Sequence, residues 1–188
     1  MSSQKFAIGL AGMAGAGKSL VVKVAKENGY GILTMGDVVR EEAEKRQLEP
    51  NPENLGKIML DLRQKEGNAV IAKRCKAKIA AAKETKILVD GIRSLDEVEE
   101  FSKHFLKFNL MAVHASPETR FKRLYRRRRS DDPECWKTFH ERDMRELSVG
   151  LGNAIVMADY IIVNEVDFET AKARARETLR KAEEKWTK

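Results

Sequence analysis

The chain has 188 residues, a length typical of a single domain, and its 42% hydrophobic content is sufficient for a full core. Its two cysteines, Cys75 and Cys135, lie far apart in sequence, which excludes a zinc ribbon and a disulfide framework. No apolar run approaches the roughly 20 residues of a membrane span, and no N-terminal targeting signal is visible, so we expect a soluble cytoplasmic protein. The net charge of +7 leaves a nucleic-acid partner open.

Short apolar runs alternate with helical patterns along the chain, which predicts a parallel sheet with helical crossovers. In chain order, the expected elements are a strand at 5–11, a helix from the following glycine-rich loop to about 28, a strand at 30–35, helices at 37–47, 52–65 and 68–83, a strand at 86–90, a helix at 94–105, a strand at 108–115, a helix from 117 into the arginines of 123–129, a helix at about 134–147, a strand at 160–164 and a terminal helix after 167. The pattern indicates an α/β fold, a five-stranded parallel sheet with helices on both faces.

Several helix starts carry recognisable end signals. Asn51 followed by Pro52 is a typical N-cap and first helical residue. Ser94 and Glu97 have the spacing of a capping box, and Asp167 is placed to cap the last helix. The stretches 37–83 and 117–158 exceed what simple crossovers need, so we expect mobile lobes there.

Residues 12–19, GMAGAGKS, match the phosphate-loop pattern G-x4-G-K-[ST] between a predicted strand and a predicted helix. Gly15 and Gly17 allow the backbone N–H groups to surround a phosphate, and the helix N-terminus adds positive potential. Lys18 is expected to reach the outer phosphates of ATP, and the Ser19 hydroxyl is expected to ligate Mg²⁺. The residues expected to contact the nucleotide here are Gly12, Met13, Ala14, Gly15, Ala16, Gly17, Lys18, Ser19 and Leu20. The loop alone fits a kinase, a GTPase or a mechanical ATPase.

Charged residues follow two further strands, at the sheet edge where the loop also lies. The segment TMGDVVR contributes Thr34, Gly36, Asp37 and Arg40, and the segment VDGIR contributes Asp90, Gly91 and Arg93. Asp90 is placed to hold Mg²⁺ through water, and the Arg93 guanidinium suits a doubly charged phosphate. Each residue alone has an ordinary alternative as a cap, turn or surface charge, but their combination beside a phosphate loop favours an acceptor site.

The densest positive cluster is RLYRRRR, residues 123–129. It is interpreted first as a lid that delivers arginines to the transferred phosphoryl group, second as a solvated face and third as a nucleic-acid surface. Only Tyr125 interleaves with these arginines, whereas nucleic-acid surfaces typically alternate cations with aromatics. Asp131 and Asp132 beside the cluster would order the lid when it closes.

Two segments resemble motifs of adenylate kinases: TMGDVVREEA is similar to their TGD-x-x-R segment, and VDGIRSLDEVEEF to their DGFPR segment. More closely, residues 5–165 resemble a family of small archaeal proteins described as related to adenylate kinase, through MGDVVREEA, PENLG, DGIRS, HASPETRF, RSDDP and ADYIIVNE. Two departures concern the base, because the DGFPR proline is absent and Glu97 stands where adenylate kinases typically have the glutamine that helps to read adenine.

The resemblance implies roles for individual residues. An acceptor monophosphate would be bound by Thr34, Gly36, Asp37, Arg40, Gly91, Arg93 and Arg145. Asp37 and Asp90 would organise Mg²⁺ and its waters. The lid would contain Arg123, Arg127, Arg129, Arg142 and Arg145, of which Arg123 and Arg127 also bind ATP. The catalytic set would be Lys18, Asp37, Arg127, Arg129 and Arg142.

The sequence therefore predicts a single P-loop kinase domain over 1–188, with an acceptor lobe at about 37–83 and a lid at about 123–146. The expected reaction is transfer of the γ-phosphoryl group of ATP to an AMP-like nucleoside monophosphate. ADYIIVNE also resembles the ADYVIDN segment of dephospho-coenzyme A kinases, which phosphorylate a ribose hydroxyl, and Asp37 could then serve as the base. A non-catalytic nucleotide sensor stays open as the alternative from another class.

Overall fold

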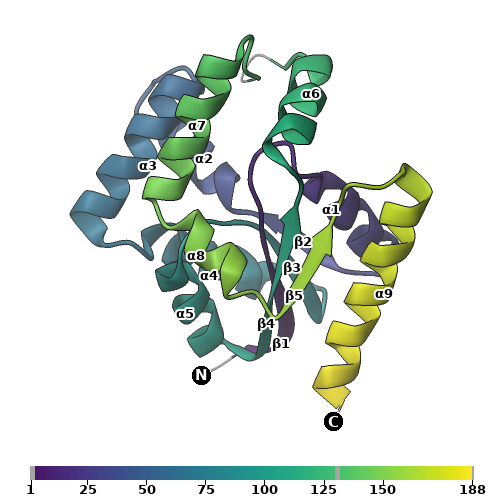
Figure 1. The fold of residues 1–188 in the computed structure, drawn as a ribbon. Helices are drawn as coiled ribbons and strands as arrows, with labels where there is room; N and C mark the ends of the chain where they lie inside the picture. The colour runs from purple at the N-terminus through teal and green to yellow at the C-terminus, as the bar shows by residue number, and fades with distance from the viewer. Residues whose placement is uncertain (1–2, 130–131, 188) are drawn as a thin grey trace.

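The computed structural model describes residues 3–129 and 132–187, which form a five-stranded parallel sheet with helices on both faces (Figure 1). The strands are β1 (Ser3–Ala11), β2 (Gly31–Thr34), β3 (Lys86–Ile92), β4 (Phe105–His114) and β5 (Tyr160–Val163). Their order is β2-β3-β1-β4-β5, and each neighbouring pair is parallel. The predicted fold class is confirmed. The central place of β1 brings the loop that follows it between the ends of β3 and β4.

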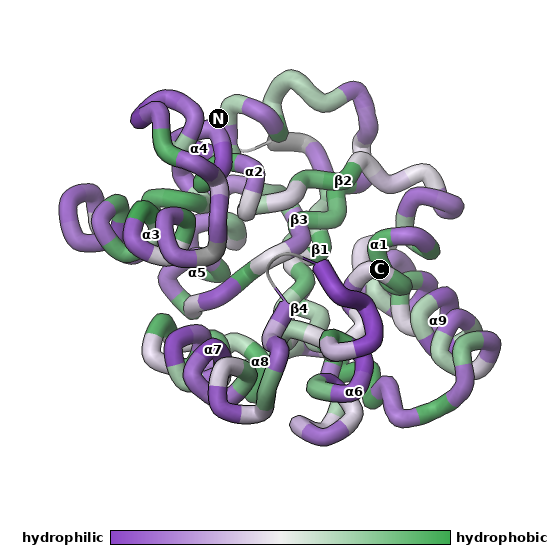
Figure 2. The backbone as a smooth tube through the Cα atoms, turned by 90° about the horizontal axis from the view of Figure 1, so that it is seen from above, coloured by the Kyte–Doolittle hydropathy of each residue, from purple (hydrophilic) through white to green (hydrophobic). Residues whose placement is uncertain are grey.

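Helices cover the sheet unequally on its two faces. One face carries α1 (Lys18–Glu27) and α9 (Phe168–Thr187), which share a core with Ile8 and Leu10 of β1. The other face carries α2 (Met35–Lys45), α3 (Pro52–Glu66), α4 (Val70–Ala81), α5 (Leu95–His104) and α8 (Leu151–Val156). Figure 2 shows these two groups on opposite sides of the strands. The central strands are buried on both faces and mostly apolar, as the sequence pattern indicated, whereas Ile161 and Val163 of the edge strand β5 are half exposed.

Two more helices, α6 (Pro117–Arg127) and α7 (Trp136–Ser148), stand above the carboxyl ends of the strands (Figure 1). In the part of the chain that the structure describes, no helix has the length and apolar character needed to cross a membrane.

Most of the predicted helix caps are present. The side chain of Asn51 accepts a hydrogen bond from the Asn54 N–H at 2.9 Å, and Asp167 accepts one from the Thr170 N–H at 3.0 Å. The capping box at Ser94 is wrong in its second half: Ser94 accepts from the Glu97 N–H, but the Glu97 carboxylate accepts from the Arg93 N–H instead. The buried Arg63 guanidinium draws the other Glu97 oxygen away at 2.5 Å.

Several boundaries also differ from the predictions. Met35, which was assigned to the second strand, opens α2, which was expected to begin at Asp37. The strand β4 begins at Phe105, which was assigned to the preceding helix, because Phe105 packs with Phe101 and Phe108 in the core. The short helix α8 was not separated from the long helical stretch before it.

The carboxylate of Glu165 ties the segment after β5 to the start of α6. It accepts hydrogen bonds from the Ser116 N–H and, at 2.7 Å, from the Thr119 hydroxyl, and these donors lower the pKa of Glu165 to about 2. Because the folded-state pKa lies below the ordinary value of 4.5, the contact stabilises the fold above that pH and is lost as pH falls toward 2.

We therefore expect Glu165→Gln to lower the free energy of unfolding at pH 7 and to flatten its decline between pH 4.5 and 2. Urea denaturation across this pH range measures both effects, with Glu44→Gln, an exposed helical glutamate, as the control. An unchanged acid profile for Glu165→Gln would contradict the role of this contact.

Candidate active site

The loop between β1 and α1 adopts a conformation that only glycine permits at its main turning points. Gly12 and Gly17 have φ values of +147° and +103°. A Cβ on Gly12 would lie 2.6 Å from the Val113 carbonyl oxygen, and one on Gly17 would lie 2.1 Å from the Asn164 amide nitrogen. The first turn of α1 follows directly and has no side-chain cap; its Leu20 N–H donates to the Gly17 carbonyl, and the N–H groups of Lys18 and Ser19 before it can face an anion.

Side chains from distant segments hold the carbonyl groups of this loop. Asn164, after β5, donates to the Ala16 oxygen at 2.8 Å. Arg123 of α6 donates to the same Ala16 carbonyl oxygen at 3.3 Å and to the backbone carbonyl oxygen of Asn164 at 2.9 Å. The structure therefore places Arg123 beside the nucleotide loop, as predicted, but on its backbone; direct contact with ATP stays a prediction. Sequence reasoning missed Asn164, although the ADYIIVNE segment that contains it was noticed.

Lys18 and Asp90 form the electrostatic centre of the site. The Lys18 ammonium donates to the Gly12 and Met13 carbonyls; burial lowers its pKa, while Asp90 and Glu146 oppose that shift. Burial also raises the pKa of Asp90, opposed by Lys18 and Arg93. Among the described residues, the buried Asp90 Oδ1 has no hydrogen-bond partner.

An unsatisfied carboxylate oxygen beside a phosphate loop is suited to a hard cation such as Mg²⁺. Ser19 lies exposed in the first turn of α1 and adds a hydroxyl oxygen. The described residues contain no group of three or more His, Cys, Asp or Glu side chains arranged to hold a metal ion. This donor set fits Mg²⁺, which keeps several waters and takes phosphate oxygens, better than it fits a metal held entirely by protein.

A cavity of about 890 Å³ lies between α2, α3, the end of β3 and α7. The predicted site residues on its wall are Gly36, Arg40, Gly91, Arg93, Arg129, Arg142 and Arg145. Sequence reasoning missed further wall residues, namely Met35, Val39, Leu55, Met59, Ile71, Arg63 and Glu146. The apolar wall residues lie on α2, α3 and α4, which also carry Arg40 and Arg63, whereas the other arginines lie on α7 and on the segments that follow β3 and α6.

Two predicted acceptor residues lie elsewhere. Thr34 and Asp37 line a smaller cavity of about 320 Å³ beside β2. Asp37 forms an exposed ion pair with Arg40 at 2.5 Å, while its charge raises the pKa of Asp90. The α2 turn directs Thr34 and Asp37 away from the wall that Gly36 and Arg40 share, which the sequence spacing alone did not reveal.

Arg93 meets an acidic partner that the sequence did not suggest. Its Nη1 lies 2.6 Å from Glu146 Oε2, and Arg142 Nε lies 3.9 Å from Glu146 Oε1. Burial raises the pKa of Glu146, but Arg93, Lys18 and Arg142 more than offset this and lower it overall. The pair therefore joins α7 to the end of β3 with both groups charged.

The helix α7 is also fastened to the nucleotide loop. Arg120 forms two bonds with Asp143, at 2.9 and 2.5 Å, and donates to the Ala14 carbonyl at 3.2 Å. Its guanidinium also lies over the Phe139 ring. The part of the predicted lid that contains Asp143 is thus bonded to the P-loop through Arg120. Motion of a lid over about 123–146 stays a prediction.

Asp132, one of the two predicted aspartates, is bonded to Arg127 at the end of α6 and to Arg129. Asp132 accepts two bonds from Arg127, at 2.9 and 2.5 Å, and one from the Arg129 N–H at 2.9 Å. Arg127 is thereby directed to Asp132, and it does not line the large cavity. Asp131 lies outside the described residues.

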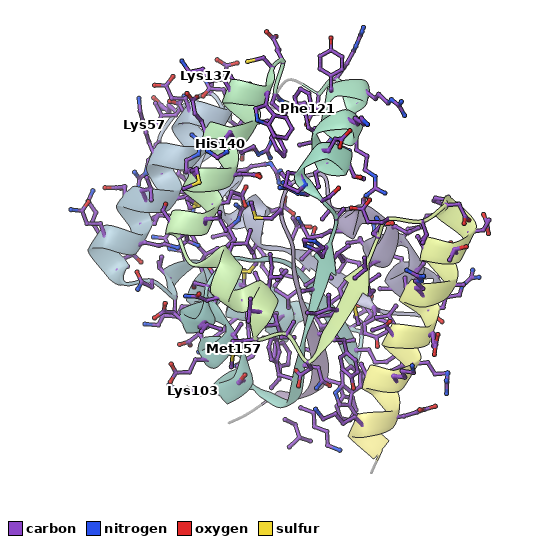
Figure 3. The ribbon with its side chains drawn as sticks, in the orientation of Figure 1. Lys57, Lys103, Phe121, Lys137, His140 and Met157 are labelled. Atoms are coloured by element: carbon purple, nitrogen blue, oxygen red, sulfur yellow. The ribbon has the colours of Figure 1, made fainter. Side chains whose placement is uncertain are left out.

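An aromatic cluster packs α6 against α7. The rings of Phe121, Tyr125, Trp136 and Phe139 lie with centroids 5.1 to 5.9 Å apart. Figure 3 shows Phe121 in the space between the two helices. The view that only Tyr125 accompanies the arginines is therefore incomplete, because α7 contributes the half-exposed Trp136. A nucleic-acid partner on this face stays a prediction.

The parallel sheet and its glycine-rich loop define a P-loop kinase fold. Similar architectures are found in a shikimate kinase from Bacteroides thetaiotaomicron (TM-score 0.59, 17% identity, 93% of this chain and 98% of that one) and a gluconokinase from Sinorhizobium meliloti (TM-score 0.60, 14% identity, 100% and 98%). Residues 11–139 match the family described as AAA domain (AAA_17).

A UPF0200 protein of Hyperthermus butylicus is 48% identical over 170 residues, which cover 90% of this chain and 91% of the relative. The chain belongs to the UPF0200 family, and the predicted membership of an archaeal P-loop family is confirmed.

Proposed function

We propose that this protein is an ATP-dependent nucleotide kinase that transfers the γ-phosphoryl group to a nucleoside monophosphate. The observation that carries the proposal is the large cavity, whose wall combines six arginines with apolar residues. The arginines are Arg40, Arg63, Arg93, Arg129, Arg142 and Arg145. Lys18 is close enough to Arg93 and Arg142 for their charges to lower its pKa, so the cavity lies next to the phosphate loop.

The roles of the donor-side residues follow from their positions. The first turn of α1 and Lys18 bind the outer phosphates of ATP. Ser19 and Asp90 would hold Mg²⁺, which would neutralise charge on the phosphate oxygens. Arg123 and Asn164 fix the shape of the loop through the Ala16 carbonyl.

On the acceptor side, Arg93 and Arg40 bind the monophosphate, while Arg129 and Arg142 stabilise the charge of the moving phosphoryl group. The apolar residues of the cavity wall suit a planar base. Glu97 is occupied by Arg63 and by the Arg93 N–H, which supports a base contact other than the adenine-reading glutamine of adenylate kinases. Because Asp37 lies outside this cavity and pairs with Arg40, its contribution is to orient Arg40.

The test is incubation with γ-labelled ATP and Mg²⁺ against AMP, GMP, CMP and UMP, dephospho-coenzyme A and a no-acceptor control. We expect a labelled nucleoside diphosphate with at least one monophosphate. A labelled product from dephospho-coenzyme A alone would replace the proposal with transfer to a ribose hydroxyl. Nucleotide binding without any labelled product would instead support a sensor.

A further inference from the structure

Glu146 lies among the cations that would receive the acceptor phosphate. It lines the same cavity as Arg93 and Arg142, and its side chain is only 11% exposed. One carboxylate oxygen faces Arg93 at 2.6 Å and the other faces Arg142 at 3.9 Å. Two oxygens directed at two guanidinium groups reproduce the way part of a phosphate would bind there.

We propose that Glu146 is a specificity-determining residue that occupies the phosphate position of the acceptor, and that the acceptor binds by displacing it. The proposal rests on the proposed function only where it names the displacing ligand as the acceptor. Arg93 is the fixed partner, held by the chain at the end of β3, and Glu146 is the group that gives way.

The Glu146 carboxylate can be displaced by rotation of its side chain alone, because contacts before and after Glu146 hold the α7 backbone in place. One turn before it, Asp143 is bonded to Arg120, which also reaches the Ala14 carbonyl. Four residues after it, Gly150 turns the chain against Arg93 and Ser94, where a Cβ would lie 3.7 Å from the Ser94 Cβ. Asp143 is bonded on one side of Glu146, and on the other side Gly150 packs closely against Arg93 and Ser94, so the side chain can leave Arg93 without moving α7.

This arrangement selects for acceptors that carry negative charge. The Arg93 side chain is 36% exposed and lines the cavity, so loss of its carboxylate partner leaves a partly desolvated charge that another anion can stabilise. A phosphate dianion carries more charge than the carboxylate and can bridge Arg93 and Arg142. A neutral hydroxyl offers no replacement. Glu146 thus favours acceptors that bear a phosphate over the corresponding nucleosides.

The experiment compares wild type, Glu146→Gln and Glu134→Gln by calorimetric titration with inorganic phosphate and with AMP. Glu134 lines the same cavity and is exposed, with no ion pair among the described residues, so its variant removes the same charge without touching Arg93. We expect Glu146→Gln to bind both ligands about tenfold more tightly, whereas Glu134→Gln changes affinity by less than about twofold. In turnover, the KM for the acceptor falls with a smaller change in kcat.

Thermal unfolding covers the case in which Glu146→Gln is less stable than wild type. Added phosphate is expected to raise its Tm more than that of wild type, because only the variant leaves Arg93 unpaired. Equal or weaker phosphate binding by Glu146→Gln would overturn the inference, as would a loss of turnover without a gain in affinity, which indicates a catalytic base. If the affinities change as expected but no acceptor is phosphorylated, the proposed function fails while the role of Glu146 stands.

Discussion

Replacing Lys18 by methionine or alanine is expected to lower kcat for phosphoryl transfer by at least about a hundredfold, the effect of losing one preorganised donor to transition-state charge. Lys18 is the cation of the nucleotide loop, and Asp90, Glu146, Arg93 and Arg142 all influence its pKa. It therefore belongs to both the donor and the acceptor side. Methionine retains the length of the side chain and removes only the charge.

The measurement is steady-state turnover together with the urea midpoint of unfolding. Lys23→Ala is the matched control, since Lys23 is exposed on the same helix. The Lys18 variants are expected to unfold cooperatively, because among the described residues the Lys18 ammonium donates to the Gly12 and Met13 carbonyls of its own loop rather than to another element. Retention of most activity by both Lys18 variants would refute the mechanism.

Replacing Asp143 by alanine is expected to give the largest loss of stability, about 3–5 kcal/mol, because it leaves the buried Arg120 without its counter-charge. The two side chains are only 5% and 10% exposed and share two hydrogen bonds. Urea denaturation measures the loss. Glu118→Ala on α6 breaks an exposed ion pair with Lys122 and is expected to change stability far less than Asp143→Ala.

The double variant Arg120→Met with Asp143→Leu separates charge from packing. Replacement of both charges by apolar groups is expected to restore much of the stability lost in Asp143→Ala. Activity is expected to stay low, since the Ala14 carbonyl of the nucleotide loop loses its donor. If Asp143→Ala were no less stable than Glu118→Ala, the pair would not be what fastens α7 to the loop.

Local patterns predicted the fold well because the central strands are buried on both faces and carry mostly apolar residues. The nucleotide loop could also be located from the sequence, because its glycines, Lys18 and Ser19 lie within one short contiguous segment. The boundary at Phe105 was wrong because Phe105 packs in the aromatic core through tertiary contacts, which a local sequence pattern does not display.

The candidate site depended on contacts between distant segments, which the sequence does not display. Glu146 meets Arg93 only because α7 folds back over the end of β3. Glu97 was interpreted as a cap because Ser94 precedes it at the right spacing, yet Arg63 of another helix captures its carboxylate. The displacement of Thr34 and Asp37 to a second cavity depends on the exact turn at the start of α2.

The support of the nucleotide loop by Asn164 has a consequence for biosynthesis. Asn164 and Ala16 are 148 residues apart, so during synthesis the loop leaves the ribosome long before its supporting amide. A nascent chain that ends after β4 contains every glycine of the loop but neither Arg123 nor Asn164. Its Ala16 carbonyl lacks both donors, and the loop gains its full support only when translation has passed β5.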